Sequence, residues 1–521
     1  MPNLSRLQRQ ALDSFQQGDL DTAERLCADI LGHRPQDFDA LHLFGMLHLE
    51  RRNVVEALRY LSTALKSNAG SSDAMSNLGL ALHASGRFED AIASYRSALC
   101  LAPDHPEILY NLANACLELG CLEEALAAYD SALACRPDHA GALVNRGNTW
   151  LRLNQPLNAV ASYDAALTVL PGHPQILTNR GHALRRLDRP DEALADFAAA
   201  LAAGPEFAEA QFEAAMTRLT LGDCARGWKQ YEWRWKTSAF ARQWRSFPAP
   251  LWLGNVPLAG KTILLHAEQG FGDTIQFIRY APLLAGQGAC VICEVQPELK
   301  PLLSQWPGVA VVAAGEALPP FDLHCPLLSL PLALKTELAT IPANVPYLAA
   351  PADRLAQWRQ RLPSDGPRAG FVWSGSATHK NDANRSIALT RLAALFESPP
   401  LRCLGLQTEL RAADREVLRG LPKLTHLGDE IRDFADTAAI ISLLDVVISV
   451  DTAAAHLAGA LGKPVIILLP HAADFRWMRQ RKDTPWYPTA KLMRQPAFGD
   501  WDSVVADLSG ELLNLAGGRR H

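Results

Sequence analysis

Two segments in the second half of the chain carry residue types that can bind a phosphate or present a carboxylate to a ligand. The first holds two glycines and one acid, Gly270, Gly272 and Asp273. The second holds an acid, a hydroxyl, a small residue and an imidazole, Asp451, Thr452, Ala453 and His456. A helix start made of small residues lets backbone N–H groups approach a phosphate closely, and Thr452 adds a hydroxyl donor. The second segment therefore predicts a site for a nucleotide diphosphate.

Short apolar strands position both segments. One series of strands is expected at 262–266, 289–295 and 309–312, and a second at 370–373, 401–404, 446–449 and 465–469. Because these strands alternate with helical stretches, they predict two parallel sheets with covered faces. Both segments follow a strand directly. They are therefore expected at the carboxyl edge of a sheet, where open α/β sheets bind their ligands.

Other interpretations of these residues stay open. The two glycines begin a dinucleotide fingerprint, but its third glycine would fall at Ile275, so nicotinamide or flavin binding is poorly supported. Asp273 could cap a helix that begins at Thr274, since aspartate is a favoured N-cap residue. His456, among alanines and leucines, could be a hydrogen-bonded core residue. Asp451 has little packing value at a strand-to-helix turn and is the firmer binding candidate.

The first half of the chain repeats one 34-residue unit seven times. A small residue in mid-helix recurs at steps of 34, at Ala11, Gly45, Gly79, Ala113, Gly147, Gly181 and Ala215. Tyr60 is out of step, but an aromatic slot follows at Tyr95, Tyr129, Tyr163, Phe197 and Tyr231, and prolines close most units at Pro35, Pro103, Pro137, Pro171 and Pro205. The pattern resembles the tetratricopeptide repeat (TPR), a helical hairpin that stacks on its neighbours into a superhelix with a concave groove.

An asparagine recurs in the four middle repeats, two residues before the small residue, at Asn77, Asn111, Asn145 and Asn179. Its amide offers donors and an acceptor, which suits the backbone of an extended peptide. This array resembles the concave asparagine array of protein O-GlcNAc transferases, and we expect it to bind an acceptor peptide. The alternative is that this asparagine is common in the repeat and caps neighbouring turns.

The composition of the 521-residue chain excludes several classes of function. Its 50 basic and 55 acidic side chains give a net charge of −5, so no nucleic-acid partner is expected. The ten cysteines form no zinc-type cluster with histidine and are typical of buried thiols in a reducing compartment. The residues after Met1 show no signal pattern, and no run of 18 apolar residues occurs. We therefore expect a cytoplasmic protein without a membrane span.

The two candidate segments, together with residues 462–465, resemble the heptosyltransferase-like glycosyltransferases (glycosyltransferase family 9), and the layout resembles that of O-GlcNAc transferase and flagellin-modifying relatives. The resemblance implies that Asp273 is the general base and that residues 451–456 contact the nucleotide-sugar. It further implies that Lys380 neutralises a phosphate oxygen. Gln407, after the following strand, would meet the nucleobase or ribose.

The predicted fold class is α plus α/β, a TPR solenoid followed by a two-lobed GT-B unit of two Rossmann-like lobes. The expected domains are a TPR superhelix (1–238), an aromatic-rich junction (239–260), an acceptor-side lobe (261–349), a linker (350–367), a nucleotide-sugar lobe (368–495) and a C-terminal helix and tail (496–521). The five tryptophans from Trp228 to Trp252 are expected to pack the junction rather than bind sugar. The first lobe is short, so the solenoid is expected to complete its acceptor side.

The expected function is transfer of a sugar from a nucleotide-sugar to a hydroxyl of a protein held in the TPR groove. The enzyme would be metal-independent, since residues 261–495 contain no DxD motif, and inverting, with no cofactor beyond its nucleotide-diphosphate sugar substrate. One alternative is a non-catalytic TPR adaptor with a degenerate GT-B domain. Another is a transferase that acts on a saccharide or a lipid-linked acceptor.

Overall fold

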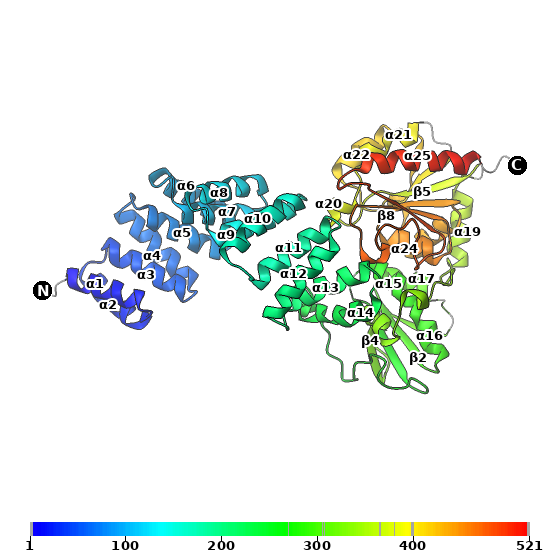
Figure 1. The fold of residues 1–521 in the computed structure, drawn as a ribbon, viewed down its shortest axis with the longest axis horizontal. Coiled ribbons are helices and arrows are strands. Elements are labelled where there is room, and N and C mark those ends of the chain that lie inside the picture. The colour runs from blue at the N-terminus through cyan, green and yellow to red at the C-terminus, as the bar shows by residue number, and fades with distance from the viewer. Residues whose placement is uncertain are drawn as a thin grey trace. The chain divides into compact units, whose positions relative to one another are not determined.

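The computed structural model describes residues 4–268, 270–304, 306, 308–363, 366–379, 381–397 and 401–517. The chain divides into two compact units, Met1–Ala183 and Leu184–His521. Each unit is described by itself below, and Figure 1 shows the elements of both with their labels. None of the described helices has the length and apolar run needed to cross a membrane.

Helical hairpins make up the repeat region. Its helices are α1 (Leu4–Gln16), α2 (Leu20–His33), α3 (Phe38–Glu50), α4 (Val54–Ser67), α5 (Ser72–Ala84), α6 (Phe88–Leu101), α7 (Pro106–Leu119), α8 (Leu122–Cys135), α9 (Ala140–Arg152), α10 (Pro156–Val169), α11 (Pro174–Arg186), α12 (Pro190–Ala203), α13 (Ala208–Thr220) and α14 (Cys224–Tyr231). The prolines that close the repeats each lie two residues beyond the end of a helix, where proline is favoured because it cannot continue the helix.

The small residue and the aromatic residue of one repeat meet where its two helices cross. A methyl group on Gly79 would lie 2.5 Å from Cε1 of Tyr95, and one on Gly147 would lie 2.5 Å from Cε1 of Tyr163. Both tyrosines are fully buried. Glycine thus leaves the space that the aromatic ring fills where the two helices cross.

The second unit contains two parallel sheets. The first sheet has the strand order β3-β2-β1-β4. Its strands and helices are β1 (Thr262–His266), α15 (Phe271–Phe277), α16 (Ala281–Gly286), β2 (Cys290–Val295), α17 (Lys300–Leu303), β3 (Val309–Ala313), β4 (Leu323–Pro326) and α18 (Leu330–Ala333). One face of this sheet, with Ile263 and Leu265 of β1, joins a large buried cluster. The other face is covered in part by Phe247, Leu318 and Phe321.

The second sheet has the strand order β10-β9-β8-β5-β6-β7, also parallel throughout. Its elements are α19 (Ala352–Arg361), β5 (Arg368–Val372), α20 (Asp382–Arg385), α21 (Leu389–Glu397), β6 (Arg402–Gly405), α22 (Ala412–Arg419), β7 (Leu424–His426), α23 (Phe434–Ser442), β8 (Val446–Val450), α24 (Ala453–Ala460), β9 (Val465–Leu469), β10 (Ala490–Arg494) and α25 (Trp501–Gly517). The expected α plus α/β class is confirmed. Figure 1 shows α15 and α24 between the two sheets, and the two helices pack against each other.

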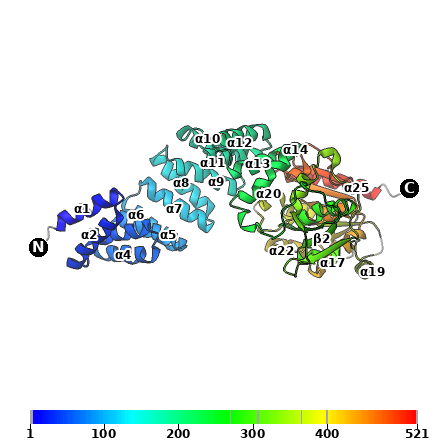
Figure 2. The same ribbon diagram turned by 90° about the horizontal axis from the view of Figure 1, so that it is seen from below.

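The last helical hairpin packs directly on the α/β part, as Figure 2 shows for α13 and α14. Trp228 of α14 makes edge contacts with Phe277 of α15 and with Phe475 beyond β9. Trp228 and Trp252 are each only 3% exposed, which confirms that these two tryptophans pack the junction. Trp244 is the exception, since 41% of its surface is exposed.

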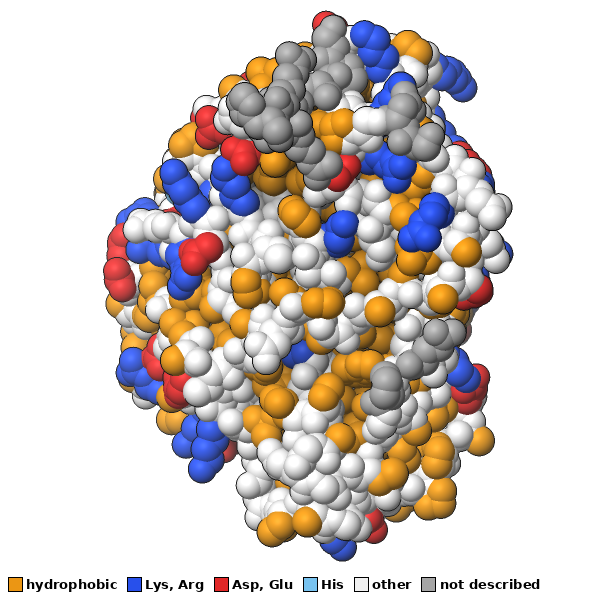
Figure 3. All heavy atoms as spheres, turned by 90° about the vertical axis from the view of Figure 1, so that its right-hand side faces the viewer, with side chains coloured by type: hydrophobic (Ala, Val, Ile, Leu, Met, Phe, Trp, Pro, Cys, Tyr) orange, Lys and Arg blue, Asp and Glu red, His pale blue; other side chains and the backbone are white. Residues whose placement is uncertain are grey.

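The view in Figure 3 shows how charge is distributed on one face of the second unit. Lysine and arginine side chains gather mainly in the upper half of this view, whereas the lower half is mostly hydrophobic or uncharged. Leu283 of α16 is among the exposed hydrophobic residues of the first lobe. Acidic side chains lie mostly near the border of the view.

Candidate active site

Asp273 lies in the first turn of α15, just beyond the carboxyl end of β1. The helix begins at Phe271 and Gly270 is its N-cap residue. The interpretation of Asp273 as the cap of a helix beginning at Thr274 is therefore wrong. Asp273 occupies the third helical position, and its side chain is 28% exposed. Asp273 is thus not the N-cap residue, although its carboxylate accepts a hydrogen bond from the backbone N–H of Gly270, and part of its side chain is accessible.

Gly272 brings the two candidate segments together. A methyl group at this position would lie 2.8 Å from Cδ2 of His456 and 3.6 Å from Cα of Ala453. Both of these residues belong to α24, in the second lobe. The glycine therefore lets α15 approach the start of α24 more closely than any other residue type allows. As a consequence, Asp273 and the first turn of α24 face the same region, although one follows the first sheet and the other the second.

The start of α24 has the form that suits an anion. Thr452 is the N-cap residue, and its backbone carbonyl accepts from the N–H groups of Ala455 (3.1 Å) and His456 (3.3 Å). The Thr452 hydroxyl is paired with Ser449 Oγ at 2.9 Å rather than with the helix. The N–H groups of the first helical turn have no partner within the helix itself, so they are the donors that a phosphate would find.

Buried side chains that contact one another lie behind the start of this helix. The Tyr487 hydroxyl and His456 Nδ1 are 3.0 Å apart, and the His456 ring stacks on Trp477 with a centroid distance of 5.2 Å. Burial holds the pKa of His456 well below its usual range, so the ring is neutral. The other ring nitrogen, Nε2, lies 3.8 Å from Asp451 Oδ1. His456 is therefore a hydrogen-bonded core residue that also backs Asp451.

Asp451 is the more unusual acid of the site. Burial raises the pKa of its carboxyl to about 6 and Asp474 adds to the rise, whereas the cations of Arg385 and Arg476 oppose it. Arg385 also donates from Nη1 to the Asp451 carbonyl at 2.9 Å. The side chain is 17% exposed. A carboxylate held in this way can accept hydrogen bonds from sugar or ribose hydroxyls while two cations stand close by.

Arg476 is the residue of the site that the sequence motifs missed. It lies in the turn η8 (Phe475–Trp477), which follows β9, and it donates from Nη2 to Asp273 Oδ1 at 2.5 Å. It donates as well to Asp474 Oδ1 at 2.8 Å and to Gln276 Oε1 at 2.6 Å. The signal that could have found it is its position in a loop after a strand of the second sheet, since such loops line the ligand edge.

The loop after β5 contributes a second cation. Arg385 passes over Gly375, where a methyl group would lie 2.4 Å from its Nη2 atom. Ser374 of the same loop is buried, and within the part of the chain that the structure describes its hydroxyl has no hydrogen-bond partner. A buried hydroxyl without a partner is costly unless a ligand or water fills that role. Lys380, predicted for this loop, lies outside the described residues.

Gln407 holds the backbone of this loop. Its Oε1 accepts from the N–H groups of Trp373 (3.2 Å) and Ser374 (3.1 Å), and its Nε2 donates to the carbonyl of Glu409. The side chain is buried. These contacts give it a positioning role in the structure, whereas contact with a nucleobase or ribose stays a prediction.

The predicted asparagines of the solenoid lie half-buried on helices α5, α7, α9 and α11. Asn145 donates to Asn114 Oδ1 at 2.9 Å and to the Tyr110 hydroxyl at 3.2 Å, and Asn179 donates to Asn148 Oδ1 at 3.2 Å. Asn77 is 2.8 Å from Nε2 of His42. These bonds reach side chains of the preceding repeat, so these three asparagines link neighbouring repeats to one another. Contact with a peptide stays a prediction.

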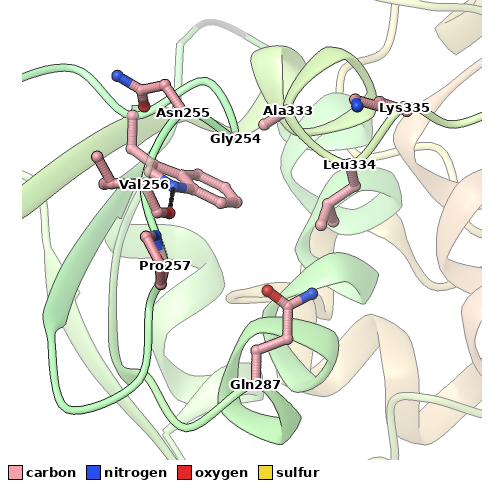
Figure 4. Close-up of a pocket in the computed structure, with 9 residues that line it drawn as sticks. Gly254, Asn255, Val256, Pro257, Gln287, Ala333, Leu334 and Lys335 are labelled. Atoms are coloured by element: carbon pink, nitrogen blue, oxygen red, sulfur yellow. Dashed lines mark hydrogen bonds between the residues drawn. The ribbon is translucent and has the colours of Figure 1, made fainter.

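A separate hollow of 420 Å³ lies in the first lobe, as shown in Figure 4. Its lining comes from residues 252–257 before β1, from Gln287 before β2 and from residues 333–335 after α18. The Trp252 indole beside it donates to the Val256 carbonyl at 2.9 Å. The hollow is therefore at the amino edge of the strands, opposite the edge where Asp273 lies, and it is not part of the candidate site.

Among the described residues, no group of three or more histidine, cysteine, aspartate or glutamate side chains is arranged to hold a metal ion. Among the residues that the structure describes, the charged groups of the candidate site include the carboxylates of Asp273, Asp451 and Asp474 and the guanidinium groups of Arg385 and Arg476.

Two solved structures are similar to part of this chain. One is a tetratricopeptide repeat protein from Parabacteroides merdae, 17% identical, which covers 44% of this chain and 91% of that chain with a TM-score of 0.37. Another is Pseudomonas aeruginosa pilF, 18% identical, which covers 39% of this chain and 95% of that chain with a TM-score of 0.35.

A curated relative extends beyond the repeats. Protein FlbA of Caulobacter vibrioides is 24% identical over 339 residues, which are 60% of this chain and 56% of FlbA. The match thus spans little more than half the length of that protein.

Family models identify both parts of the chain. Two tetratricopeptide repeat models match residues 82–146, and residues 42–106 and 178–227. The model of glycosyltransferase family 9 (heptosyltransferase) matches residues 421–493, the stretch that contains Asp451, His456 and Arg476. Residues 42–146 and 178–227 are thus similar to tetratricopeptide repeats, and residues 421–493 are similar to glycosyltransferase family 9.

Proposed function

We propose that this protein transfers a sugar from a nucleotide-diphosphate sugar to a hydroxyl group of a protein acceptor. Asp273 takes the proton of the acceptor hydroxyl as its oxygen forms a bond to the anomeric carbon. The bond from that carbon to the diphosphate oxygen breaks, and its electron pair leaves with the nucleoside diphosphate. Attack from the side opposite the leaving group inverts the configuration at the anomeric carbon.

In this proposal the diphosphate lies at the start of α24. Its negative charge is stabilised by the backbone N–H groups of Ala453 and Ala454, by the Arg385 guanidinium and by the Ser374 hydroxyl. Asp451 accepts hydrogen bonds from hydroxyl groups of the donor. Because fixed cations and helix N–H groups supply the positive charge, the proposed reaction requires no metal ion.

One observation carries the proposal: Gly272 packs directly on the start of α24. A base from the first lobe and a phosphate-binding helix start from the second can act on one ligand only when they face it. The close packing at Gly272, where an added methyl group would lie 3.6 Å from Cα of Ala453, supports that arrangement. The glycine has no other evident reason to be so small, since it is helical and needs no left-handed backbone.

The acceptor is proposed to be a protein because of the repeats. Tetratricopeptide repeats are protein-interaction modules, and the last of them shares a buried cluster with the first sheet through Leu219, Trp228 and Tyr231. The half-buried asparagines of α5 to α11 are proposed to contact the acceptor backbone. Each side-chain amide has two N–H donors, so Asn179, which donates one bond to the neighbouring repeat, keeps one N–H for a peptide, whereas both N–H groups of Asn145 are already used.

The donor site can be tested by thermal stabilisation with UDP, GDP, ADP and CMP types of nucleotide and nucleotide-sugar. A ligand at about 100 times its Kd adds roughly 2.7 kcal/mol of stability, enough to shift a melting transition. One class should stabilise the wild type and stabilise Arg385→Gln much less. Arg391→Gln is the matched control, since Arg391 is an exposed arginine that pairs with Asp502. Stabilisation of neither protein by any nucleotide would favour the non-catalytic adaptor.

Transfer itself can be tested with the nucleotide-sugar whose nucleotide binds, labelled in its sugar, in an extract of the source cells. Label that enters protein and is resistant to organic extraction supports the proposal. Label that partitions into the organic phase, or into free saccharide, identifies a lipid-linked or saccharide acceptor instead. Binding without any incorporation would leave a ligand-sensing adaptor as the better description.

A further inference from the structure

Arg476 connects the two lobes at the candidate base. Its three polar nitrogens each have a partner: Nη2 donates to Asp273, Nη1 to Asp474 and Nε to Gln276. Asp273 and Gln276 belong to α15 of the first lobe, whereas Arg476 and Asp474 belong to the loop after β9 of the second. The Arg476 side chain is only 9% exposed. A guanidinium fixed at all three nitrogens holds its partners in one geometry.

The two carboxylates on Arg476 differ in how firmly they are held. Asp474 is the N-cap residue of η8 and also accepts from the backbone N–H of Arg476 at 3.0 Å, so it is tied to its own loop. Asp273 is reached across the lobes and is 28% exposed. Arg476 therefore fixes the direction of the carboxylate that is open to a ligand.

Several charged or titratable groups face Asp273 from the elements around it. They are Arg476 and Asp474 of the loop after β9, His379 of the loop after β5, Glu268 of the loop after β1 and Tyr231 of α14. Arg476 is the guanidinium among them that bonds to Asp273. Burial raises the pKa of Asp273, and Arg476 is the main group that opposes this rise.

We propose that Arg476 is a positioning residue for Asp273, which keeps this carboxylate ionised and aimed into the space between the lobes. The inference rests on the proposed function, in which Asp273 acts as the base. A general base must be deprotonated before it can accept a proton, and burial works against this. The guanidinium offsets that effect without occupying the far oxygen of the carboxylate, since its bond is to Oδ1.

The test is the pH dependence of kcat/KM for sugar transfer in the wild type, Arg476→Gln, Arg476→Lys and Arg479→Gln. Loss of the cation raises the pKa of Asp273, so the acidic limb of the Arg476→Gln profile should move to higher pH by about one unit. Arg476→Lys keeps the charge and should stay near the wild type. Arg479→Gln removes an arginine from the same loop, one that pairs with Asp188 and not with Asp273, and should leave the limb in place. A rate in Arg476→Gln that falls by one factor at every pH would overturn the proposal.

A second measurement does not depend on activity. Melting temperatures of the wild type, Asp273→Asn, Arg476→Gln and the double variant, without any nucleotide, form a double-mutant cycle. The effect of Asp273→Asn should differ between the wild-type and Arg476→Gln backgrounds, whereas additive shifts would overturn the inference. If the wild type transfers no sugar but the cycle shows coupling, the proposed function fails and the pairing of Arg476 with Asp273 stands.

Discussion

Polar side chains serve different purposes in the solenoid and in the α/β part. In the solenoid, Asn145 and Asn179 bond to side chains of the preceding repeat, and the same pattern recurs at intervals of one repeat. In the α/β part, Asp273 and Arg476 come from different lobes and occur once. Removal of one solenoid bond therefore leaves others like it, whereas removal of Asp273 or Arg476 leaves no group that replaces it. We therefore expect a single substitution to reduce activity or stability more in the candidate site than in the solenoid.

The largest effect is expected from Asp273→Asn. The amide is almost the same size as the carboxylate but cannot accept a proton at neutral pH, so kcat should fall by about a thousandfold. Stabilisation by the nucleotide should persist, because the proposed phosphate cradle lies on α24. A transfer assay and a thermal-shift assay on the same preparation separate the two effects. Retention of more than about a tenth of the wild-type rate would remove Asp273 from the role of base.

The next effect is expected from Gly272→Ala. The added methyl group would meet the His456 ring at 2.8 Å, and that ring is fixed by Tyr487 and by stacking on Trp477. Overpacking of this kind costs about 1–3 kcal/mol, and here it would also separate α15 from α24. Melting temperature and transfer rate should therefore fall together.

Gly286→Ala is the matched control for that substitution. Gly286 ends α16, and a methyl group there has no neighbour within 4 Å among the described residues. Its melting temperature should stay at or above that of the wild type. Equal losses in the two alanine variants would show that close packing at position 272 has no special importance.

Much of the fold follows from local pattern. The repeat predicts its own helices, and the apolar runs predict β1 and β9 with the bounds that they have. β4, β7 and β10 fall outside such runs. β4 contains a histidine and a proline, β7 has three residues, and β10 is an edge strand with an exposed Lys491. Their place in the sheets is fixed by tertiary pairing, which a single short segment does not reveal.

Fewer residues of the candidate site than of the fold can be predicted from the sequence, for a related reason. Asp273 and Asp451 can be found because each follows a clear strand and stands beside small residues. Arg476 has no motif around it, and its importance comes from contact with a helix 203 positions away in the sequence. Gln407 shows the converse, since its position after a strand suggests a ligand contact whereas its bonds are to the backbone of Trp373 and Ser374.

Asp451→Asn should change the pH dependence of stability. The pKa of Asp451 is raised from 3.8 to about 6 in the folded chain, mainly by burial. The folded state therefore holds this proton more tightly than the unfolded state, and wild-type stability is lost as pH rises from about 4 to about 6. Asparagine carries no charge, so the variant should be more stable than the wild type by about 3 kcal/mol at about pH 8 and nearly equal to it at about pH 3.5.

The measurement for Asp451 is a series of melting curves across this pH range. Asp502→Asn serves as the control, because the Asp502 side chain is 80% exposed and carries no comparable burial cost. A gap between Asp451→Asn and the wild type that is the same at every pH would show that the carboxylate is not penalised by burial. Such a result would also weaken the contrast between the candidate site and the solenoid.

The smallest effect is expected from Asn145→Ala, and it tests the solenoid side of the comparison. The substitution removes the bonds to Asn114 and Tyr110, each worth about 1 kcal/mol at most for a half-buried group. Asn111→Ala is the matched control, since among the described residues the Asn111 amide makes no hydrogen bond. The repeats should therefore unfold at slightly lower urea concentration in Asn145→Ala than in Asn111→Ala.

If these amides contact an acceptor, both variants should weaken acceptor binding by similar small factors. The reason is that contact with a peptide depends on the position of the asparagine in the repeat and not on its bond to the neighbouring repeat. A large loss of acceptor binding in Asn145→Ala alone would mean that the bonds between repeats, and not direct contacts of the amides with the acceptor, determine acceptor binding.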